Sequence, residues 1–357
     1  MSEKPVKLAC RNLWKLFGDG AARFVARHGE TADAAAIQAA GLIGAVRNVN
    51  IDVRQDEIFV IMGLSGSGKS TLLRAVNGLN PIVQGDVLIH DGQGMVSVPK
   101  ASGATLRRLR MQHVAMVFQQ FGLLPWRSVR ENVGLGLELA GMGRRERRER
   151  IDEQLTLVGL SQWADRKVGE LSGGMQQRVG LARAFATRAP ILLMDEPFSA
   201  LDPLIRTRLQ DELLDLQARL KRTIIFVSHD LDEAFKLGNR IAIMEGGRII
   251  QCGTPSEIYT NPANGYVADF VAHMNPLGVL RARDAAVAPP RPVPTGQTLP
   301  ADTPLREAMQ VLAQAHGPIL LTEDGRVTGM LTDAAAVRAL IARRGQEAQE
   351  TEAGADS

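Results

Sequence analysis

The sequence has few cysteines, few aromatic residues and no long apolar run, and each shortage limits what the protein can be. Only Cys10 and Cys252 carry thiols among 357 residues, so no disulfide framework is available and a reducing compartment is expected. The longest apolar stretches, such as 58–62 and 191–194, are far shorter than the roughly 20 residues of a membrane-spanning helix. The first residues, MSEKPVKLAC, lack the apolar segment of a signal peptide. The sequence therefore predicts a cytosolic protein whose membrane role would depend on a partner.

An excess of charge of one sign is also lacking. The formal net charge is +3, which is too small to indicate a nucleic-acid partner. The one charge run, RRERRER at 144–150, is typical of a solvated helix face with mixed-sign neighbours. Hydrophobic residues make up 45% and charged residues 23%, as in an ordinary folded protein, and the length indicates two or three domains of roughly 100–200 residues each.

Predicted strands alternate with predicted helices over most of the chain. Strands are expected at 6–17, 46–53, 57–62, 86–90, 114–118, 191–194, 223–228 and 241–250. Helices are expected from residue 70 onward and at 145–158, 175–188, 203–220 and 231–237, with a helical insertion at 21–40. Segments 46–53 and 57–62 have the pattern of a hairpin that leads into a buried strand. This alternation predicts an α/β fold with a largely parallel core sheet.

The composition changes near the C-terminus. Five prolines and many alanines at 283–303 indicate a linker, which we place at 276–303. The range 304–343 resumes an α/β pattern of helix, strand, turn, strand and helix, and 344–357 has the composition of a disordered acidic tail.

A glycine-rich segment follows the apolar stretch 57–62 and precedes a predicted helix. Its spacing, G-x-x-x-x-G-K-S, is that of a phosphate-binding loop. Its residues are Gly63, Leu64, Ser65, Gly66, Ser67, Gly68, Lys69, Ser70 and Thr71. Backbone N–H groups and the helix N-terminus favour phosphate in such a loop. We expect Lys69 to reach the β- and γ-phosphates and the Ser70 hydroxyl to bind Mg²⁺.

A second motif places two carboxylates at the end of an apolar strand. The segment ILLM at 191–194 is followed by Asp195 and Glu196. Such a strand delivers one carboxylate to the metal region and a second one to an attacking water. We therefore expect Asp195 on the Mg²⁺ side and Glu196 as the general base.

A third motif, LSGGMQ at 171–176, lies upstream of the acidic strand end. Taken alone, it could be a loop in which Ser172 caps a helix. Together with the other motifs it resembles the ATP-binding-cassette (ABC) ATPases, whose signature is LSGGQ, although Met175 stands at the fifth position and Gln176 follows it. The resemblance covers residues 6–275 and implies that Ser172, Gly173, Gly174 and Gln176 contact nucleotide.

Further family landmarks match in order. Gln119 resembles the glutamine that senses Mg²⁺ and contacts the membrane subunit, and the segment 199–202, which ends at Asp202, resembles the D-loop. His229 resembles the switch histidine at the γ-phosphate, which with Glu196 gives the expected catalytic pair. Phe17 stands where the family keeps an adenine-stacking aromatic, although the insertion near 18–44 loosens that match.

The resemblance implies a P-loop NTPase of the ABC type at 1–275, with a helical signature subdomain. It implies ATP and Mg²⁺ as cofactors and a homodimer in which each copy completes the other copy's site. It also implies integral membrane permease subunits, a periplasmic or extracellular solute-binding protein, and a peripheral position on the cytoplasmic face of the cell membrane.

A finer resemblance is to ATPases of quaternary-amine importers. The insertion after Phe17 and the runs at 57–79, 198–213 and 228–234 carry it, and the runs at 118–139 and 266–284 are most similar to choline-uptake ATPases. Choline is therefore the expected substrate, with glycine betaine or proline betaine as the alternative. Cation–π cages normally select such ions, and only 4% of this chain is aromatic, so substrate selection is expected in another polypeptide.

Two alternatives stay open at this level. The segment 304–343 resembles a single cystathionine-β-synthase (CBS) repeat, which would either sense nucleotide or ionic strength or serve a structural role. A soluble ABC ATPase of DNA repair or translation would share the nucleotide chemistry. Such proteins usually carry long coiled coils, zinc modules or two fused cassettes, and none of these is visible in the sequence.

Overall fold

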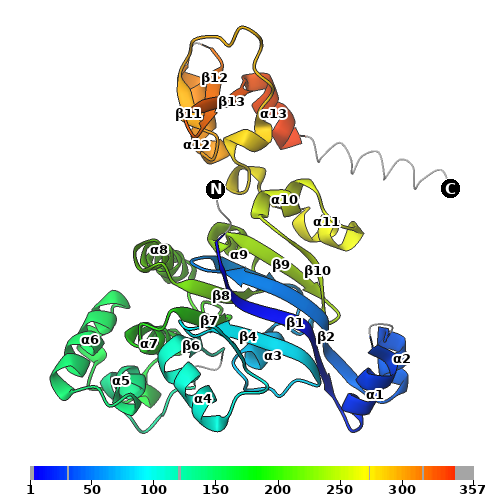
Figure 1. Ribbon diagram of the computed structural model, residues 1–357. Helices are drawn as coiled ribbons and strands as arrows, with labels where there is room; N and C mark the ends of the chain where they lie inside the picture. The colour runs from blue at the N-terminus through cyan, green and yellow to red at the C-terminus, as the bar shows by residue number, and fades with distance from the viewer. Residues whose placement is uncertain (1–3, 30–31, 120–121, 273, 316, 342–357) are drawn as a thin grey trace. The chain divides into compact units, whose positions relative to one another are not determined.

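The computed structural model describes residues 4–341 apart from 30–31, 120–121, 273 and 316. The chain forms two compact units (Figure 1), one of residues 1–230 and 237–252, and the other of 231–236 and 253–357. The acidic tail predicted at 344–357 lies outside the described residues, and so do 342 and 343.

The first unit is built on a sheet in the order β10-β9-β3-β8-β7-β6. Its strands are β3 (Ile58–Met62), β6 (Val114–Val117), β7 (Ile191–Asp195), β8 (Thr223–Ser228), β9 (Arg240–Glu245) and β10 (Arg248–Gly253). The pairs from β9 through β6 are parallel. Strands β3, β7 and β8 are buried along their whole length, which explains their unbroken apolar sequences.

A second sheet of this unit has the order β2-β1-β4-β5 and is antiparallel. Its strands are β1 (Val6–Phe17), β2 (Ile43–Arg54), β4 (Gln84–His90) and β5 (Met95–Ser97). The hairpin predicted between 46–53 and 57–62 is wrong, because β2 pairs with β1 and β3 lies in the parallel sheet. Residues of β2 alternate between buried and partly exposed, whereas β3 is buried on both faces, so the two neighbouring strands belong in different layers.

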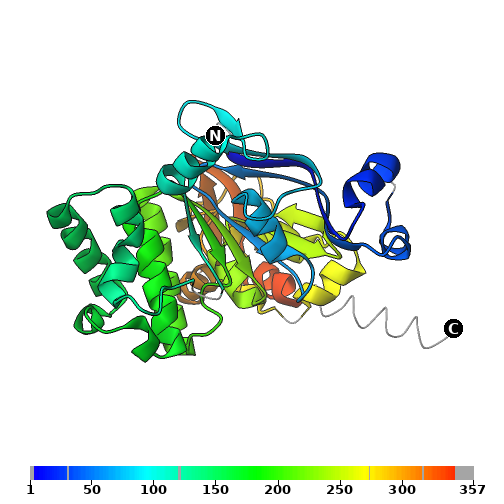
Figure 2. The ribbon, with the colours of Figure 1, turned by 90° about the horizontal axis from the view of Figure 1, so that it is seen from below.

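Helix α3 (Lys69–Val76) contacts strands of both sheets. Figure 2 shows it between the two layers. Leu72, Leu73 and Val76 belong to one continuous apolar core with residues of both sheets. This core fixes the start of α3, and therefore the phosphate loop, against the end of β3.

Helices α5 (Val129–Leu139), α6 (Arg144–Leu157) and α7 (Gly173–Ala186) pack on one another and form the predicted helical subdomain. Figures 1 and 2 show α5 and α6 on one side of the unit and the inserted helices α1 (Ala21–His28) and α2 (Ala34–Ala39) on the opposite side. The insertion has a small core of its own, in which Trp14, Val25 and Ile37 are buried. The remaining helical segments of the unit are α4 (Gly103–Arg108), the π-helical turn 109–113, short 3₁₀ turns at 161–163 and 168–170, and α8 (Pro203–Leu220); α9 (Leu231–Leu237) follows.

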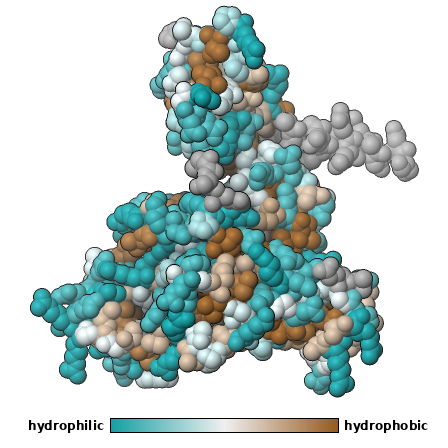
Figure 3. All heavy atoms as spheres, in the orientation of Figure 1, coloured by the Kyte–Doolittle hydropathy of each residue, from teal (hydrophilic) through white to brown (hydrophobic). Residues whose placement is uncertain are grey.

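The second unit contains a sheet in the order β11-β12-β13. Its elements are α10 (Pro255–Thr260), α11 (Gly265–Val271), β11 (Thr298–Pro300), α12 (Leu305–Gln314), β12 (Ile319–Glu323), β13 (Arg326–Leu331) and α13 (Asp333–Ile341), with 3₁₀ turns at 276–278 and 282–285. Part of the range predicted to be a linker is ordered by pairing: β11 pairs with β12, and Val287 forms a bridge with Met330. Figure 3 shows apolar atoms at the surface of this unit. Val327, Val337 and Ile341 are among its exposed apolar residues.

Candidate functional site

The phosphate loop connects β3 to α3 in a conformation that depends on glycine. Gly68 has a φ of +100°, and a Cβ placed there would lie 1.9 Å from the carbonyl oxygen of Ala45. Gly63 has a φ of +151°, and its Cβ would lie 2.1 Å from the carbonyl oxygen of Met244. Both the left-handed backbone and the close packing therefore exclude side chains at these positions.

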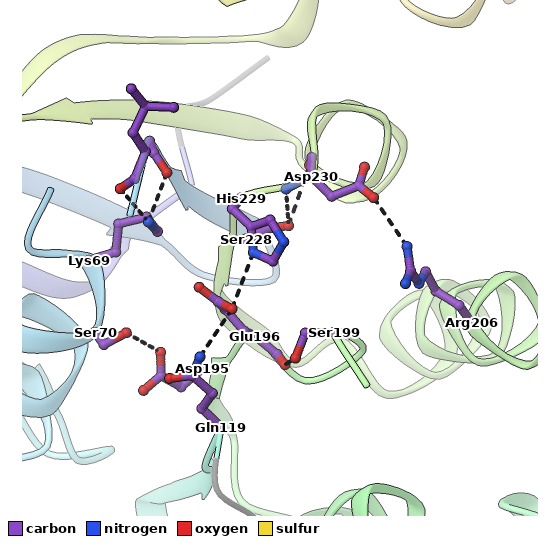
Figure 4. A network of polar contacts seen from close by, with 12 residues as sticks. Lys69, Ser70, Gln119, Asp195, Glu196, Ser199, Arg206, Ser228, His229 and Asp230 are labelled. Atoms are coloured by element: carbon purple, nitrogen blue, oxygen red, sulfur yellow. Dashed lines mark hydrogen bonds and ion pairs between the residues drawn. The ribbon is translucent and has the colours of Figure 1, made fainter. Parts of the chain in front are cut away.

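The side chain of Lys69 folds back toward the start of the phosphate loop (Figure 4). Its Nζ donates to the carbonyl oxygens of Gly63 at 2.8 Å and Leu64 at 2.9 Å. Burial lowers the pKa of Lys69, while the negative charges of Glu196 and Asp195 act in the opposite direction. The ammonium is therefore held where the first turn of α3 meets the loop.

Ser70 and Asp195 form a pair of oxygen ligands next to the loop. The Ser70 hydroxyl donates to Oδ1 of Asp195 at 2.7 Å, and Asp195 is fully buried at the end of β7. The other carboxylate oxygen accepts from Arg74 at 3.3 Å. No group of three His, Cys, Asp or Glu residues that could hold a metal occurs in the described part of the chain. One hydroxyl and one carboxylate nevertheless fit Mg²⁺, which prefers oxygen and shares its coordination with waters and substrate phosphates.

Glu196 contacts two residues, Gln119 and His229, to which the sequence assigns other roles. Its Oε2 accepts from Nε2 of Gln119 at 3.2 Å and lies 3.2 Å from Nδ1 of His229 (Figure 4). Gln119 follows β6, Glu196 follows β7 and His229 follows β8. Because the carboxyl ends of adjacent parallel strands meet at one edge of the sheet, these side chains converge.

The backbone of Glu196 is strained. Its φ is +47°, in the left-handed region that residues with a Cβ avoid, and Pro197 follows it. Holding a residue in this conformation costs about 1–3 kcal/mol of folding free energy, so the conformation persists only where its surroundings hold it. The Ser199 hydroxyl donates to the Glu196 carbonyl oxygen at 3.0 Å, which is one of the contacts that hold this turn.

The signature residues make local contacts at the start of α7. The Ser172 hydroxyl accepts from the Met175 N–H at 3.4 Å as the N-cap, and Gln176 donates to the Leu171 carbonyl oxygen at 3.0 Å. A Cβ at Gly173 would meet open space, whereas one at Gly174 would lie 3.6 Å from the carbonyl oxygen of Ala200. Within the described residues, no hydrogen bond joins this group to the phosphate loop.

Asp202 caps α8. As the N-cap residue, it accepts a hydrogen bond from the Ile205 N–H through Oδ1 at 3.0 Å. Pro203 is the first helical residue. The structure therefore gives Asp202 a local role in its own chain. Arg206 of the same helix pairs with Asp230 at 3.3 Å (Figure 4).

Phe17 lies at the end of β1, opposite Ile43 of β2. The residue is 42% exposed and the Lys15 ammonium lies 4.6 Å from the centre of its ring. Ala45, whose carbonyl oxygen limits the space at Gly68, stands two positions after Ile43. The exposed ring is therefore on the strand pair that borders the phosphate loop, and the inserted helices leave β1 intact up to this residue.

Two site residues were missed from the sequence. Arg74 lies on α3 four positions after Ser70, so the i, i+4 spacing could have placed it on the same helix face. Gln177 is 1% exposed, and its Nε2 donates to the Glu196 carbonyl oxygen at 3.4 Å. Nothing in the local sequence signals this contact between α7 and the turn after β7.

These features define a nucleoside triphosphatase of the phosphate-loop class. A family model described as ABC transporter matches residues 46–199. The chain is 50% identical over 282 residues to the glycine betaine/proline betaine transport system ATP-binding protein ProV of Salmonella typhimurium, covering 79% of this chain and 70% of that protein. It is 43% identical over 340 residues to the trimethylamine N-oxide transport system ATP-binding protein TmoW of Ruegeria pomeroyi, covering 94% of this chain and 97% of the other.

A solved structure shows the same fold. The dimeric, post-hydrolysis state of the ATP-binding cassette MJ0796 with ADP and Pi matches with a TM-score of 0.60 and 31% identity, over 69% of this chain and 98% of that one. The chain belongs to the ABC transporter family, as one of its ATPase subunits. Every helix in the described part of the chain is too short or too polar to span a lipid bilayer.

Proposed function

We propose that the chain hydrolyses ATP to energise an ABC importer of a quaternary ammonium compound or a related methylated amine. The observation that carries the hydrolytic part is the convergence of Gln119 and His229 on Glu196, beside the Ser70–Asp195 pair. The substrate class is supported by relatives at 43–50% identity that are ATP-binding proteins of glycine betaine, proline betaine and trimethylamine N-oxide systems.

The phosphate loop and Phe17 bind the nucleotide in this proposal. Lys69 exchanges its contacts with the carbonyl oxygens of Gly63 and Leu64 for β- and γ-phosphate oxygens, with backbone N–H groups of 63–71 around them. The exposed face of Phe17 stacks on the adenine. Ser70, Asp195 and Gln119 would hold Mg²⁺, which neutralises charge on the phosphates.

Glu196 acts as the general base. Its carboxylate accepts a proton from the attacking water, and His229, whose Nδ1 lies 3.2 Å from this carboxylate, contacts the γ-phosphate in this proposal. Gln119 donates to the same carboxylate oxygen that His229 contacts. Binding of ATP would release the Gln119 amide from this oxygen toward Mg²⁺. In this proposal the three strand ends hold the base next to the attacking water and the γ-phosphate.

Two copies are needed to complete each site. Among the described residues, the side-chain hydrogen bonds of Ser172, Gln176 and Asp202 stay within their own helices and turns, yet Ser172 and Gly173 are exposed. In the proposed homodimer these residues reach the nucleotide held by the phosphate loop of the other copy. The dimer of the similar cassette with ADP and Pi supports this arrangement.

The remaining partners follow from the importer role. Integral permease subunits would hold the dimer at the cytoplasmic face of the cell membrane, and a periplasmic or extracellular binding protein would deliver substrate. The relatives favour this role over a soluble ABC ATPase of repair or translation. Purification of a complex with an integral membrane protein would support the importer, and recovery of nothing but a soluble dimer would contradict it.

The transported compound is tested by uptake. The sequence resemblance favours choline, and glycine betaine is equally compatible with the relatives. A deletion strain complemented with wild-type chain or with Glu196→Gln should take up labelled choline, glycine betaine or trimethylamine N-oxide only with the wild type. If the strain with the wild-type chain takes up none of the three compounds, although the wild-type chain and the Glu196→Gln variant are both expressed, the proposed substrate class is wrong.

A further inference from the structure

The carbonyl oxygen of Glu196 is held by groups from two different elements. It accepts from the Ser199 hydroxyl at 3.0 Å and the Ser199 N–H at 3.4 Å, both within the turn after β7 (Figure 4). It also accepts from Nε2 of Gln177 at 3.4 Å. Gln177 lies on α7, the helix that begins at Ser172, so a side chain of the signature helix contacts the backbone of the proposed general base.

Gln177 is an unusual residue for its surroundings. Its side chain is 1% exposed, and its Oε1 has no hydrogen-bond partner among the described residues. Burial of an amide is unfavourable unless its hydrogen bonds are made. An apolar side chain of the same length would fill the space without a buried, unpaired oxygen, so the contact of Nε2 with Glu196 is what the amide contributes.

Glu196 is the residue that needs such a contact. With a φ of +47° before Pro197, its backbone would relax toward the extended region if nothing held it. A rotation at this residue would move the carboxylate away from Gln119 and His229. Donors to the carbonyl oxygen of Glu196 oppose that rotation directly.

We propose that Gln177 is a positioning residue for hydrolysis, which rests on the proposed role of Glu196 as general base. Its amide fixes the left-handed backbone of Glu196 and so sets the position of the carboxylate. The 3.4 Å contact tightens in the substrate complex, as catalytic hydrogen bonds commonly do. Ser172 and Gly174 begin the same helix. Docking of the signature on a second copy's nucleotide therefore also sets the position of Glu196 in the copy that carries this signature.

The first test compares steady-state ATP hydrolysis by full-length variants. Gln177→Met removes the amide but keeps the length of the side chain. It should lower kcat about tenfold, a loss in the range expected when a reacting group is misplaced, with KM and the Kd for ATP unchanged. The matched control is Gln154→Met, another buried glutamine of the helical subdomain, on α6, which should retain wild-type kcat.

The second test separates positioning from a structural role. In a Glu196→Ala background, adding Gln177→Met should leave the residual rate unchanged, because the base that it positions is already gone. Gln177→Glu should regain activity relative to wild type as the pH falls, since a protonated carboxyl can donate to the Glu196 carbonyl oxygen and a carboxylate cannot. Burial raises the pKa of such a carboxyl, which brings this recovery toward neutral pH.

Two outcomes would overturn the proposal. Gln177→Met could match wild type in kcat, or it could lower the rate by the same factor with and without Glu196, which is the behaviour of a structural residue. Failure of the proposed base has a different signature: Glu196→Ala would then hydrolyse ATP near the wild-type rate whatever stands at 177. The three results are therefore distinguishable in one set of proteins.

Discussion

At the scale of single residues, the proposed chemistry depends on one carboxylate that two side chains already contact. Gln119 and His229 both lie 3.2 Å from Oε2 of Glu196, and the residue itself is held in a left-handed backbone. Asp195, one position earlier, is directed instead toward Ser70 and Arg74. Adjacent residues at a strand end thus make separate contacts because their side chains leave the chain in different directions.

Replacing the proposed base separates binding from hydrolysis. Glu196→Gln keeps the size and hydrogen-bonding shape of the side chain, so ATP should bind with near wild-type affinity while hydrolysis falls about a thousandfold. A dimer should then accumulate with ATP, measured by size-exclusion chromatography. The control is Glu153→Gln, a surface partner of Arg188, which should hydrolyse normally. Hydrolysis near the wild-type rate in Glu196→Gln would show that another group is the base.

At the scale of secondary-structure elements, the site is a set of junctions at which strands pass into loops. The loop after β3 fits against the Ala45 carbonyl oxygen of β2, and the loops after β6, β7 and β8 carry the polar side chains. The junctions are rigid because each strand is buried on both faces. Small changes of backbone at these points should therefore alter function more than changes within the helices.

Two glycines of the phosphate loop provide a matched comparison. Gly66 and Gly68 both have left-handed backbones, but a Cβ at Gly66 meets nothing within 4 Å, whereas one at Gly68 lies 1.9 Å from the Ala45 carbonyl oxygen. Conformational strain is therefore common to both, and only Gly68→Ala adds a clash. By calorimetric titration, Gly68→Ala should lose at least about tenfold more ATP affinity than Gly66→Ala. Equal losses would contradict the close packing on β2.

The turn between β4 and β5 gives a pH-dependent prediction. Hydrogen bonds from the Gln93 N–H and from Arg108 of α4 lower the pKa of Asp91 to about 2. The ionised carboxylate therefore stabilises the fold above the ordinary aspartate pKa of about 3.9, and this contribution is lost as the pH falls toward 2. In urea unfolding, wild type should exceed Asp91→Asn in midpoint at pH 7, with the gap closing below about pH 4. A gap independent of pH would contradict this role.

At the scale of the whole molecule, every residue proposed to contact nucleotide or metal lies in the first unit. The second unit has a sheet of its own and contributes none of them. The apolar side chains exposed there, such as Val337 and Ile341, are not among the residues proposed to bind nucleotide or to catalyse hydrolysis. The sequence resemblance of 304–343 to a CBS repeat leaves sensing and structural roles as the two hypotheses for this unit.

Truncation distinguishes these hypotheses. Deletion of 298–357 should leave ATP affinity and basal hydrolysis within about twofold of wild type, because the site residues are retained. A second truncation after Val279 removes the segment that pairs with the deleted sheet, which controls for misfolding of the remainder. Transport is then measured against ionic strength in the assembled importer. An unchanged salt response would remove the sensing hypothesis, and a lost response would support it.

Local patterns in the sequence predict the nucleotide-binding motifs and most of the helices and strands. The phosphate loop, the Asp-Glu strand end and the signature are contiguous patterns, so they mark Lys69, Ser70, Asp195 and Glu196 as candidate site residues without coordinates. Helix α8 was predicted with its observed bounds, because Asp202 and Pro203 mark its start locally.

Which distant residues meet depends on the order of the strands, and no single segment of the sequence contains that order. The strand order β10-β9-β3-β8-β7-β6 joins segments far apart in the chain, and it is this order that gathers Gln119, Glu196 and His229. The same holds for β2, whose partner is β1, and for the contact of Gln177 with Glu196. Non-local pairing is selected by the burial of whole faces and layers, a quantity that no short stretch of sequence contains.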